Sequence, residues 1–176
     1  MAENMQKRNK SCLTEGKESW KRYGKLKHVV IQNINEENLT SDPSKSEAYF
    51  GNLLHGRVPG FCDYTLILWH ENTDNSYLSV AITFKVEEVT YTLVSDGKGN
   101  LGIEKGKLPD NVDGTVCPFI FHIRKCAAGD HSGYAFCCAD GCGYLSYNDD
   151  KQAILKDLPD VCTDDSCKMT VFSTKE

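Results

Sequence analysis

Tyr64-Thr-Leu-Ile-Leu-Trp69, Tyr77-Leu-Ser-Val-Ala-Ile-Thr-Phe84 and Val89-Thr-Tyr-Thr-Leu-Val94 occupy the middle of this 176-residue chain. The three runs are short and rich in β-branched and aromatic residues, and most alternate apolar with polar or small residues. Alternation with a period of two places one face of a strand on a core and the other in water. Turn-forming clusters at 71–75 and 95–100 separate the runs, so the stretch predicts successive strands joined by turns.

The same rhythm extends from Lys27 to Phe172 and shows no convincing long helix. It predicts an all-β fold of roughly twelve strands, which is typical of an antiparallel sandwich or barrel. About twelve strands suit a β-trefoil, in which three four-stranded units close a barrel, and a β-sandwich is the alternative. No repeat is visible at the expected period of about 50 residues, so the pattern alone leaves both open. Segment 48–54 fits either a strand or a short helical turn.

Length and composition indicate one globular domain. Apolar residues make up 40% of the chain and charged residues 26%, which is typical of a packed core. No apolar run approaches the roughly 20 residues that span a bilayer, and the N-terminus lacks the apolar segment of a signal peptide. We therefore expect synthesis in the cytosol without membrane insertion, and secretion by a leaderless route.

The charges are unevenly distributed. Residues 1–27 contain eight bases and three acids, whereas the remainder contains 12 bases and 22 acids, a net charge of −10. An acidic body argues against nucleic acid as the main partner, because phosphate binding needs a basic face. Residues 1–22 have no period, so we predict a basic flexible tail or pro-segment there and a folded domain at 23–176.

No catalytic or metal-binding pattern stands out. Cys138 and Cys142, with Cys162 and Cys167, match paired zinc-ligand spacing only loosely, and a bridge from Cys162 to Cys167 after export is an alternative. A cysteine enzyme would need a thiolate beside a histidine, yet none of the five histidines belongs to a motif. The glycines of 97–100 fit a hairpin turn better than a phosphate cradle. We predict no enzyme activity, catalytic residue, metal site or cofactor.

One aromatic strand anchors the second half of the domain. Alternation predicts that Phe119, Phe121 and Ile123 share one face, opposite Ile120, His122 and Arg124. Packing in the core explains these rings better than a ligand pocket does.

Several motifs occur in a familiar order. They are Tyr23-Gly-Lys-Leu26, Val30-Ile-Gln-Asn-Ile-Asn35, Leu108-Pro-Asp-Asn-Val112, Phe119-Ile-Phe121 followed by Arg124, Gly143-Tyr-Leu145 and Met169-Thr-Val-Phe172. Their order and spacing over residues 23–173 resemble the interleukin-1 superfamily, with the interleukin-18 branch first. The C-terminal third is also similar to the interleukin-33 branch.

The resemblance implies a β-trefoil cytokine, monomeric and pro-inflammatory, that induces interferon-gamma-type responses. Its partners would be a primary and an accessory receptor chain built from immunoglobulin domains, and a soluble binding protein is a further partner of this kind. A receptor antagonist or decoy and an interleukin-33-like cytokine are the alternatives.

The resemblance also suggests receptor-contact residues. Lys25, Leu26, Lys27 and Arg124 keep the family's character in one basic patch, where Leu78 replaces a methionine. Gln32, which replaces an arginine, and Glu36 belong to a second patch. Lys98 matches a lysine of the accessory-receptor region, whereas Glu104 reverses the charge of another.

Processing is the largest departure from the family pattern. Family precursors are cut after an aspartate that precedes the mature start, but residues 1–22 contain no aspartate. If Tyr23 is the mature start, a trypsin-like protease would cut after Arg22, and the absence of any processing is the alternative.

A carbohydrate-binding trefoil is the third class of function. It would need a basic sulfate-binding cluster or repeated glutamine–aromatic motifs, and the sequence shows neither.

Overall fold

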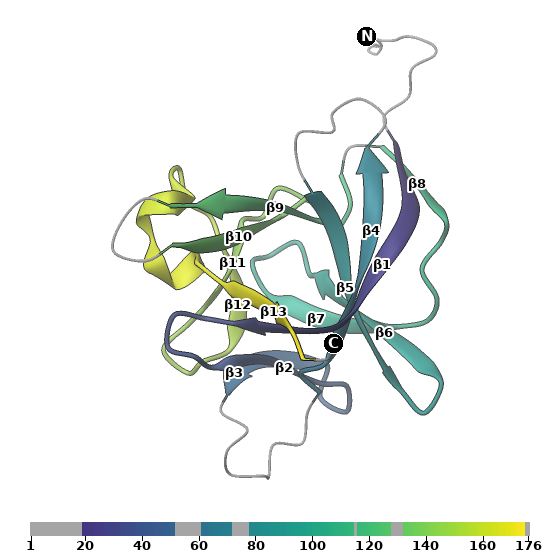
Figure 1. The fold of residues 1–176 in the computed structure, drawn as a ribbon, viewed down its shortest axis with the longest axis horizontal. Helices are drawn as coiled ribbons and strands as arrows, with labels where there is room; N and C mark the ends of the chain where they lie inside the picture. The colour runs from purple at the N-terminus through teal and green to yellow at the C-terminus, as the bar shows by residue number, and fades with distance from the viewer. Residues whose placement is uncertain (1–18, 52–60, 72–77, 115, 128–131, 175–176) are drawn as a thin grey trace, which may run out of the picture.

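The computed structural model describes residues 19–51, 61–71, 78–114, 116–127 and 132–174. In these ranges the chain consists of strands and two short 3-10 helices (Figure 1). All the strand pairs described are antiparallel, so the prediction of an all-β fold is confirmed. The elements are β1 (Ser19–Gln32), β2 (Asn38–Asp42), β3 (Glu47–Gly51), β4 (Tyr64–Glu71), β5 (Leu78–Val86), β6 (Val89–Ser95), β7 (Leu101–Lys105), β8 (Asn111–Asp113), β9 (Phe121–Cys126), β10 (Gly133–Cys138), β11 (Tyr144–Tyr147), β12 (Ala153–Lys156), η2 (Val161–Thr163), η3 (Asp165–Cys167) and β13 (Thr170–Ser173).

The strands form one sheet that nearly closes into a barrel. Its hydrogen-bonded order is β12-β11-β10-β9-β5-β4-β1-β2-β3, while β8 and β13 also pair with β1. The two ends of this order approach each other where Tyr49 of β3 forms a bridge with Gln152, next to β12. The amide of Phe50 reinforces the closure, because it donates to the carbonyl of Lys151 at 2.7 Å.

The predicted central strands form consecutive pairs. β4 pairs with β5, and β5 pairs with β6. The 95–100 cluster joins β6 to β7 as a hairpin turn, where the Asp96 carboxylate accepts the amides of Lys98 and Asn100 at 2.7 and 3.1 Å. These bonds favour the charged carboxylate and hold the pKa of Asp96 below its usual value. Segment 48–54 is strand as far as Gly51, and its last three residues lie outside the described ranges.

The main core lies inside the barrel, where residues of alternate positions on β4, β5 and β9 meet. Phe121 and Ile123 face this core, as the alternation predicted, whereas His122 and Arg124 do not. Phe119 and Ile120 depart from the pattern because β9 begins only at Phe121. Both pack instead in a second apolar cluster with Trp20 and Trp69.

β1 begins earlier than the predicted domain start. Trp20 is only 1% exposed and packs in the second cluster, and it pairs with Val112 of β8 and Glu71 of β4. Residues 19–22 therefore belong to a strand that has neighbours on both sides, rather than to the tail predicted at 1–22. The rest of that tail, residues 1–18, lies outside the described ranges.

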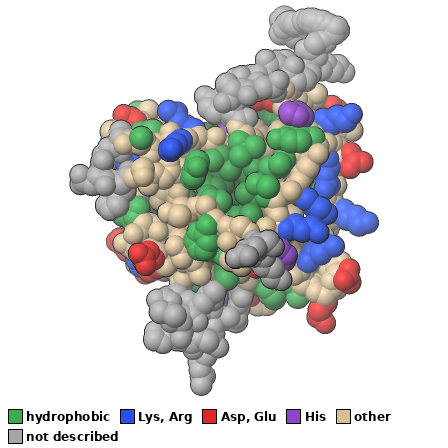
Figure 2. Space-filling model, viewed as in Figure 1, with side chains coloured by type: hydrophobic (Ala, Val, Ile, Leu, Met, Phe, Trp, Pro, Cys, Tyr) green, Lys and Arg blue, Asp and Glu red, His purple; other side chains and the backbone are tan. Residues whose placement is uncertain are grey.

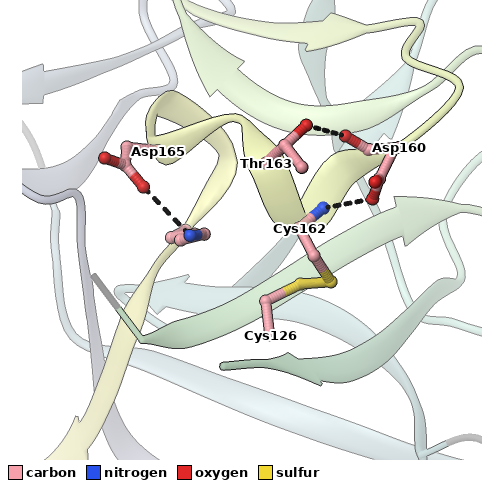
Figure 3. The surroundings of a disulfide bond; sticks show 6 residues. Cys126, Asp160, Cys162, Thr163 and Asp165 are labelled. Atoms are coloured by element: carbon pink, nitrogen blue, oxygen red, sulfur yellow. Dashed lines mark hydrogen bonds and ion pairs between the residues drawn. A yellow bond between two sulfur atoms is a disulfide. The ribbon is translucent and has the colours of Figure 1, made fainter. Parts of the chain in front are cut away.

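A disulfide holds the C-terminal segment against β9 (Figure 3). It joins Cys126, which is fully buried, to Cys162 of η2. Asp160 caps η2: its carboxylate accepts the amide of Cys162 at 3.1 Å, and its carbonyl accepts the hydroxyl of Thr163 at 3.0 Å. The suggested bridge between Cys162 and Cys167 is therefore wrong, because Cys167 lies buried with a free thiol in the adjoining η3.

Removal of this disulfide should destabilise the domain. It closes a loop across a sequence separation of 36 residues, so the double substitution Cys126→Ser/Cys162→Ser should lower the free energy of unfolding by about 2–4 kcal/mol. Urea denaturation without added oxidant or reductant measures the difference in unfolding free energy between the variant and the parent. Cys62→Ser is the control, because Cys62 is a partly exposed free thiol and should have little effect. Equal midpoints for the double variant and the parent would contradict the prediction.

No helix among the described residues is long and apolar enough to cross a membrane.

Candidate recognition surface

A groove of about 730 Å³ runs beside β1, and cationic side chains outnumber carboxylates in its lining. We call it the basic groove, because five cationic side chains line it: Arg22, Lys25 and Lys27 from β1, Lys85 from β5 and Lys107 from the segment between β7 and β8. Only two carboxylates, Asp63 and Asp110, line the same groove. The groove is therefore locally positive in a chain whose net charge is −5.

Strand register explains how these side chains converge. Lys25 pairs with Ile67 of β4, and directly opposed residues lie on the same face of a sheet. The register then shifts, because Lys27 and His28 together stand opposite the single residue Thr65. This β-bulge allows both Lys27 and His28 to line the groove although they are adjacent in the chain.

The lining of the groove also contains aromatic, aliphatic and hydroxyl side chains. The Phe61 ring stacks on Phe84 with centroids 5.7 Å apart, and 38% of Phe61 is exposed. Ile67 and Leu108 add apolar surface, while Thr65, Thr83 and Thr90 add hydroxyl groups. At the rim, Asp63 meets His28, with 3.1 Å between the carboxylate oxygen and Nδ1.

An exposed apolar surface lies on the other face of β1. We call it the apolar face: Tyr23 and Leu26 of β1 and Leu78 of β5. Tyr23, Leu26 and Leu78 are 50%, 47% and 42% exposed, and the Tyr23 ring stacks on His70 at 3.8 Å. Figure 2 shows hydrophobic side chains gathered over the centre of this view, with Lys and Arg side chains along its right-hand side.

No protein-family model and no curated protein matches the sequence. The assignment of function therefore depends on the surface chemistry and on the collinear motifs of the chain.

The structure separates the residues of the first predicted patch. Lys25 and Lys27 line the basic groove, whereas Leu26 belongs to the apolar face together with Leu78. Arg124 joins neither group. It lies on β9, three strands or about 14 Å across the sheet from β1. Its neighbour Ile123 pairs with Leu78 of the apolar face, so the Arg124 side chain emerges on the opposite face of the sheet. Its positive charge instead acts on Tyr144, where it opposes the rise in pKa that burial causes.

The second predicted patch stays together at the far end of β1. Gln32 ends β1, and its side-chain amide donates to Asn38 Oδ1 at 2.9 Å. Glu36 is exposed in the turn to β2 and has a left-handed backbone, with φ of 61°. Lys98 and Glu104 are both exposed, in the β6–β7 turn and on β7 respectively, so the charge reversal at Glu104 faces solvent.

Sequence reasoning missed Lys85 and Lys107 as members of a site. Lys85 does follow Thr83 with the period of a strand, which could have placed both on one face. Lys107 carries no such signal, because it lies outside the strands and reaches the groove only through the fold. Arg22 was predicted as a processing residue, and the structure places it in the groove as well.

Buried thiols offer little nucleophilic chemistry. Burial raises the pKa of Cys117, Cys137, Cys138 and Cys167, which keeps these thiols protonated at neutral pH. Across the described ranges, no group of three or more His, Cys, Asp or Glu residues could hold a metal ion.

Proposed function

We propose that this chain is an interleukin-18-like pro-inflammatory cytokine, a β-trefoil that binds immunoglobulin-domain receptor chains. The observation that carries the proposal is the juxtaposition of the basic groove and the apolar face along β1. Protein interfaces combine an apolar centre with a polar, charged rim, and this surface offers both. The collinear motifs of the sequence supply the class of receptor.

Two features of the fold support the proposal. The antiparallel sheet that nearly closes into a barrel suits a trefoil better than an open sandwich. The disulfide between Cys126 and Cys162 suits an oxidising extracellular environment, where such bonds persist. The cytokine would therefore act outside the cell.

Charge reversal in β1 tests receptor binding. Lys25→Glu/Lys27→Glu should weaken binding to the ectodomain of an interleukin-18-type primary receptor by about tenfold to hundredfold, mainly through a slower association rate. Both side chains are exposed, so stability should change little. Surface plasmon resonance at low and high salt measures the rates, and the difference from the parent should shrink as salt rises.

The matched control is Lys45→Glu/Lys125→Glu, which makes the same change in charge at exposed positions outside the groove. It should bind the receptor nearly as the parent does. Equal association rates for the parent and the β1 variant at low salt would reject the proposed receptor surface.

A further inference from the structure

We propose that the basic groove is also a binding site for a sulfated or phosphorylated sugar. This site goes beyond receptor binding and does not depend on it. The sequence shows no basic cluster of the kind that a sulfate-binding trefoil needs. The fold assembles one, because β1, β5 and the β7–β8 segment bring five cations to a single concavity.

The charge pattern selects a ligand with several separate anionic groups. Three of the cations come from β1, and Lys85 and Lys107 reach the groove from other elements. Cations on different walls can each meet a different sulfate or phosphate group, whereas a single small anion would contact only a few of them. Arg22 can also bind such a group with two parallel hydrogen bonds, which a lysine cannot do.

The uncharged side chains that line the groove favour a sugar as the molecule that bears the sulfate or phosphate groups. The exposed ring of Phe61 gives an apolar platform for the C–H face of a pyranose or cyclitol ring. Thr65 and Thr90 supply hydroxyl groups, and the carboxylates of Asp63 and Asp110 can accept hydrogen bonds from free sugar hydroxyls. The volume of about 730 Å³ lies within the usual range for small-ligand sites.

The surroundings argue against a long nucleic acid. Glu87 and Glu88 form the exposed turn that follows β5 just beyond Lys85, so negative charge lies near that wall of the groove. Asp63 and Asp110 would also repel a backbone that places a phosphate at every step. These four carboxylates favour a short ligand that combines anionic groups with neutral hydroxyls.

Isothermal titration of the full chain with three probes tests the proposal: a heparin-derived tetrasaccharide, inositol hexakisphosphate and inorganic phosphate. We expect at least one of the two sugars to bind at physiological ionic strength, and inorganic phosphate to bind much more weakly. Tetrasaccharide binding alone identifies a sulfated glycan as the ligand class. Hexakisphosphate binding alone identifies a phosphorylated sugar, and binding of both supports the shared chemistry.

The variant pair locates the site. Lys85→Glu/Lys107→Glu should weaken sugar binding by about tenfold or more, because two charge-assisted contacts are lost. Both residues belong to the basic groove, but the variant leaves Lys25 and Lys27 unchanged, so receptor affinity measured on the same variant separates a loss of sugar binding from a loss of receptor binding. The control Lys45→Glu/Lys125→Glu carries the same net charge and should bind the sugar as the parent does. Lys85→Gln/Lys107→Gln repeats the test without charge reversal, and thermal unfolding shows whether each variant is folded.

Three results would overturn the proposal. One is that neither sugar binds more tightly than inorganic phosphate. Another is an equal loss of affinity in the groove variant and its control, which would indicate a response to net charge alone. The third is displacement of the bound sugar by a single-stranded oligonucleotide at the same concentration as by the sugar itself, which would indicate an unselective polyanion surface.

Discussion

A chain shortened to residues 23–176 is expected to lose about 3–5 kcal/mol of unfolding free energy relative to one that begins at Ser19. The reason is Trp20, which is 1% exposed and shares the second apolar cluster with Ile67, Trp69 and Ile120. Loss of the indole opens a cavity that the neighbouring side chains can fill only in part. The shorter chain also loses the pairing of residues 19–21 with β8.

Urea denaturation of residues 19–176 and 23–176 measures the difference, and Trp20→Ala in the full chain isolates the side chain from the backbone. Lys21→Ala is the matched control, because Lys21 is exposed in the same strand and should cost little. Equal denaturation midpoints for the two truncated chains would contradict this account of the second cluster.

The same strand bears on processing at Arg22. The Arg22–Tyr23 bond lies inside β1 at a β-bulge, where Arg22 and Gly24 pair with consecutive residues of β4, and the Arg22 amide donates to the Asp110 carbonyl at 3.1 Å. Proteases prefer exposed loop tips to paired strands. We therefore expect the folded chain to resist trypsin at Arg22. Cleavage there, which the suggested mature start at Tyr23 requires, would separate Trp20 from the domain and remove its ring from the second apolar cluster.

Asp165→Ala is expected to destabilise the domain by about 2–3 kcal/mol, less than for a fully buried ion pair because 31% of the Asp165 side chain is exposed. The Lys168 side chain is fully buried, and its Nζ lies 2.9 Å from Asp165 Oδ1. Without this carboxylate the buried ammonium loses a compensating negative charge. Lys168→Met should cost less, because it removes the buried charge and keeps most of the apolar side chain.

A double-mutant cycle decides whether this explanation holds. Asp165→Ala/Lys168→Met should be more stable than Asp165→Ala alone, because the second substitution removes the buried positive charge that has lost the Asp165 carboxylate. Urea denaturation of the four proteins gives the coupling free energy. A double variant as unstable as the sum of the single variants would show that the two side chains act independently.

The local pattern of apolar and polar residues predicted the strands but did not predict which residues form the recognition surface. The run at 89–94 alternates apolar residues with threonines and becomes β6. The run at 64–69 is almost continuously apolar and becomes β4, which is buried on both faces: Leu66 lies in the main core and Trp69 in the second cluster. Trp20 was missed because its neighbours Lys21 and Arg22 are basic and no apolar alternation surrounds it. A single large ring can nevertheless fix the start of a strand.

The groove and the disulfide depend on distances that no local pattern encodes. Cys126 and Cys162 are far apart in the chain and meet where the capped 3-10 turn η2 lies against β9. Lys25 and Lys85 share the groove because β1, β4 and β5 lie in a particular register. A shift of one residue in any of these pairings would place different side chains there.

The bulge at Lys27 and His28 has a practical consequence for protein engineering. A one-residue insertion between Gly24 and Lys25 would exchange the faces of the sheet on which Lys25 and Leu26 emerge. Leu26 would then replace Lys25 in the lining of the basic groove. Libraries that aim to alter ligand preference should therefore vary side-chain identity in this strand and keep its length constant.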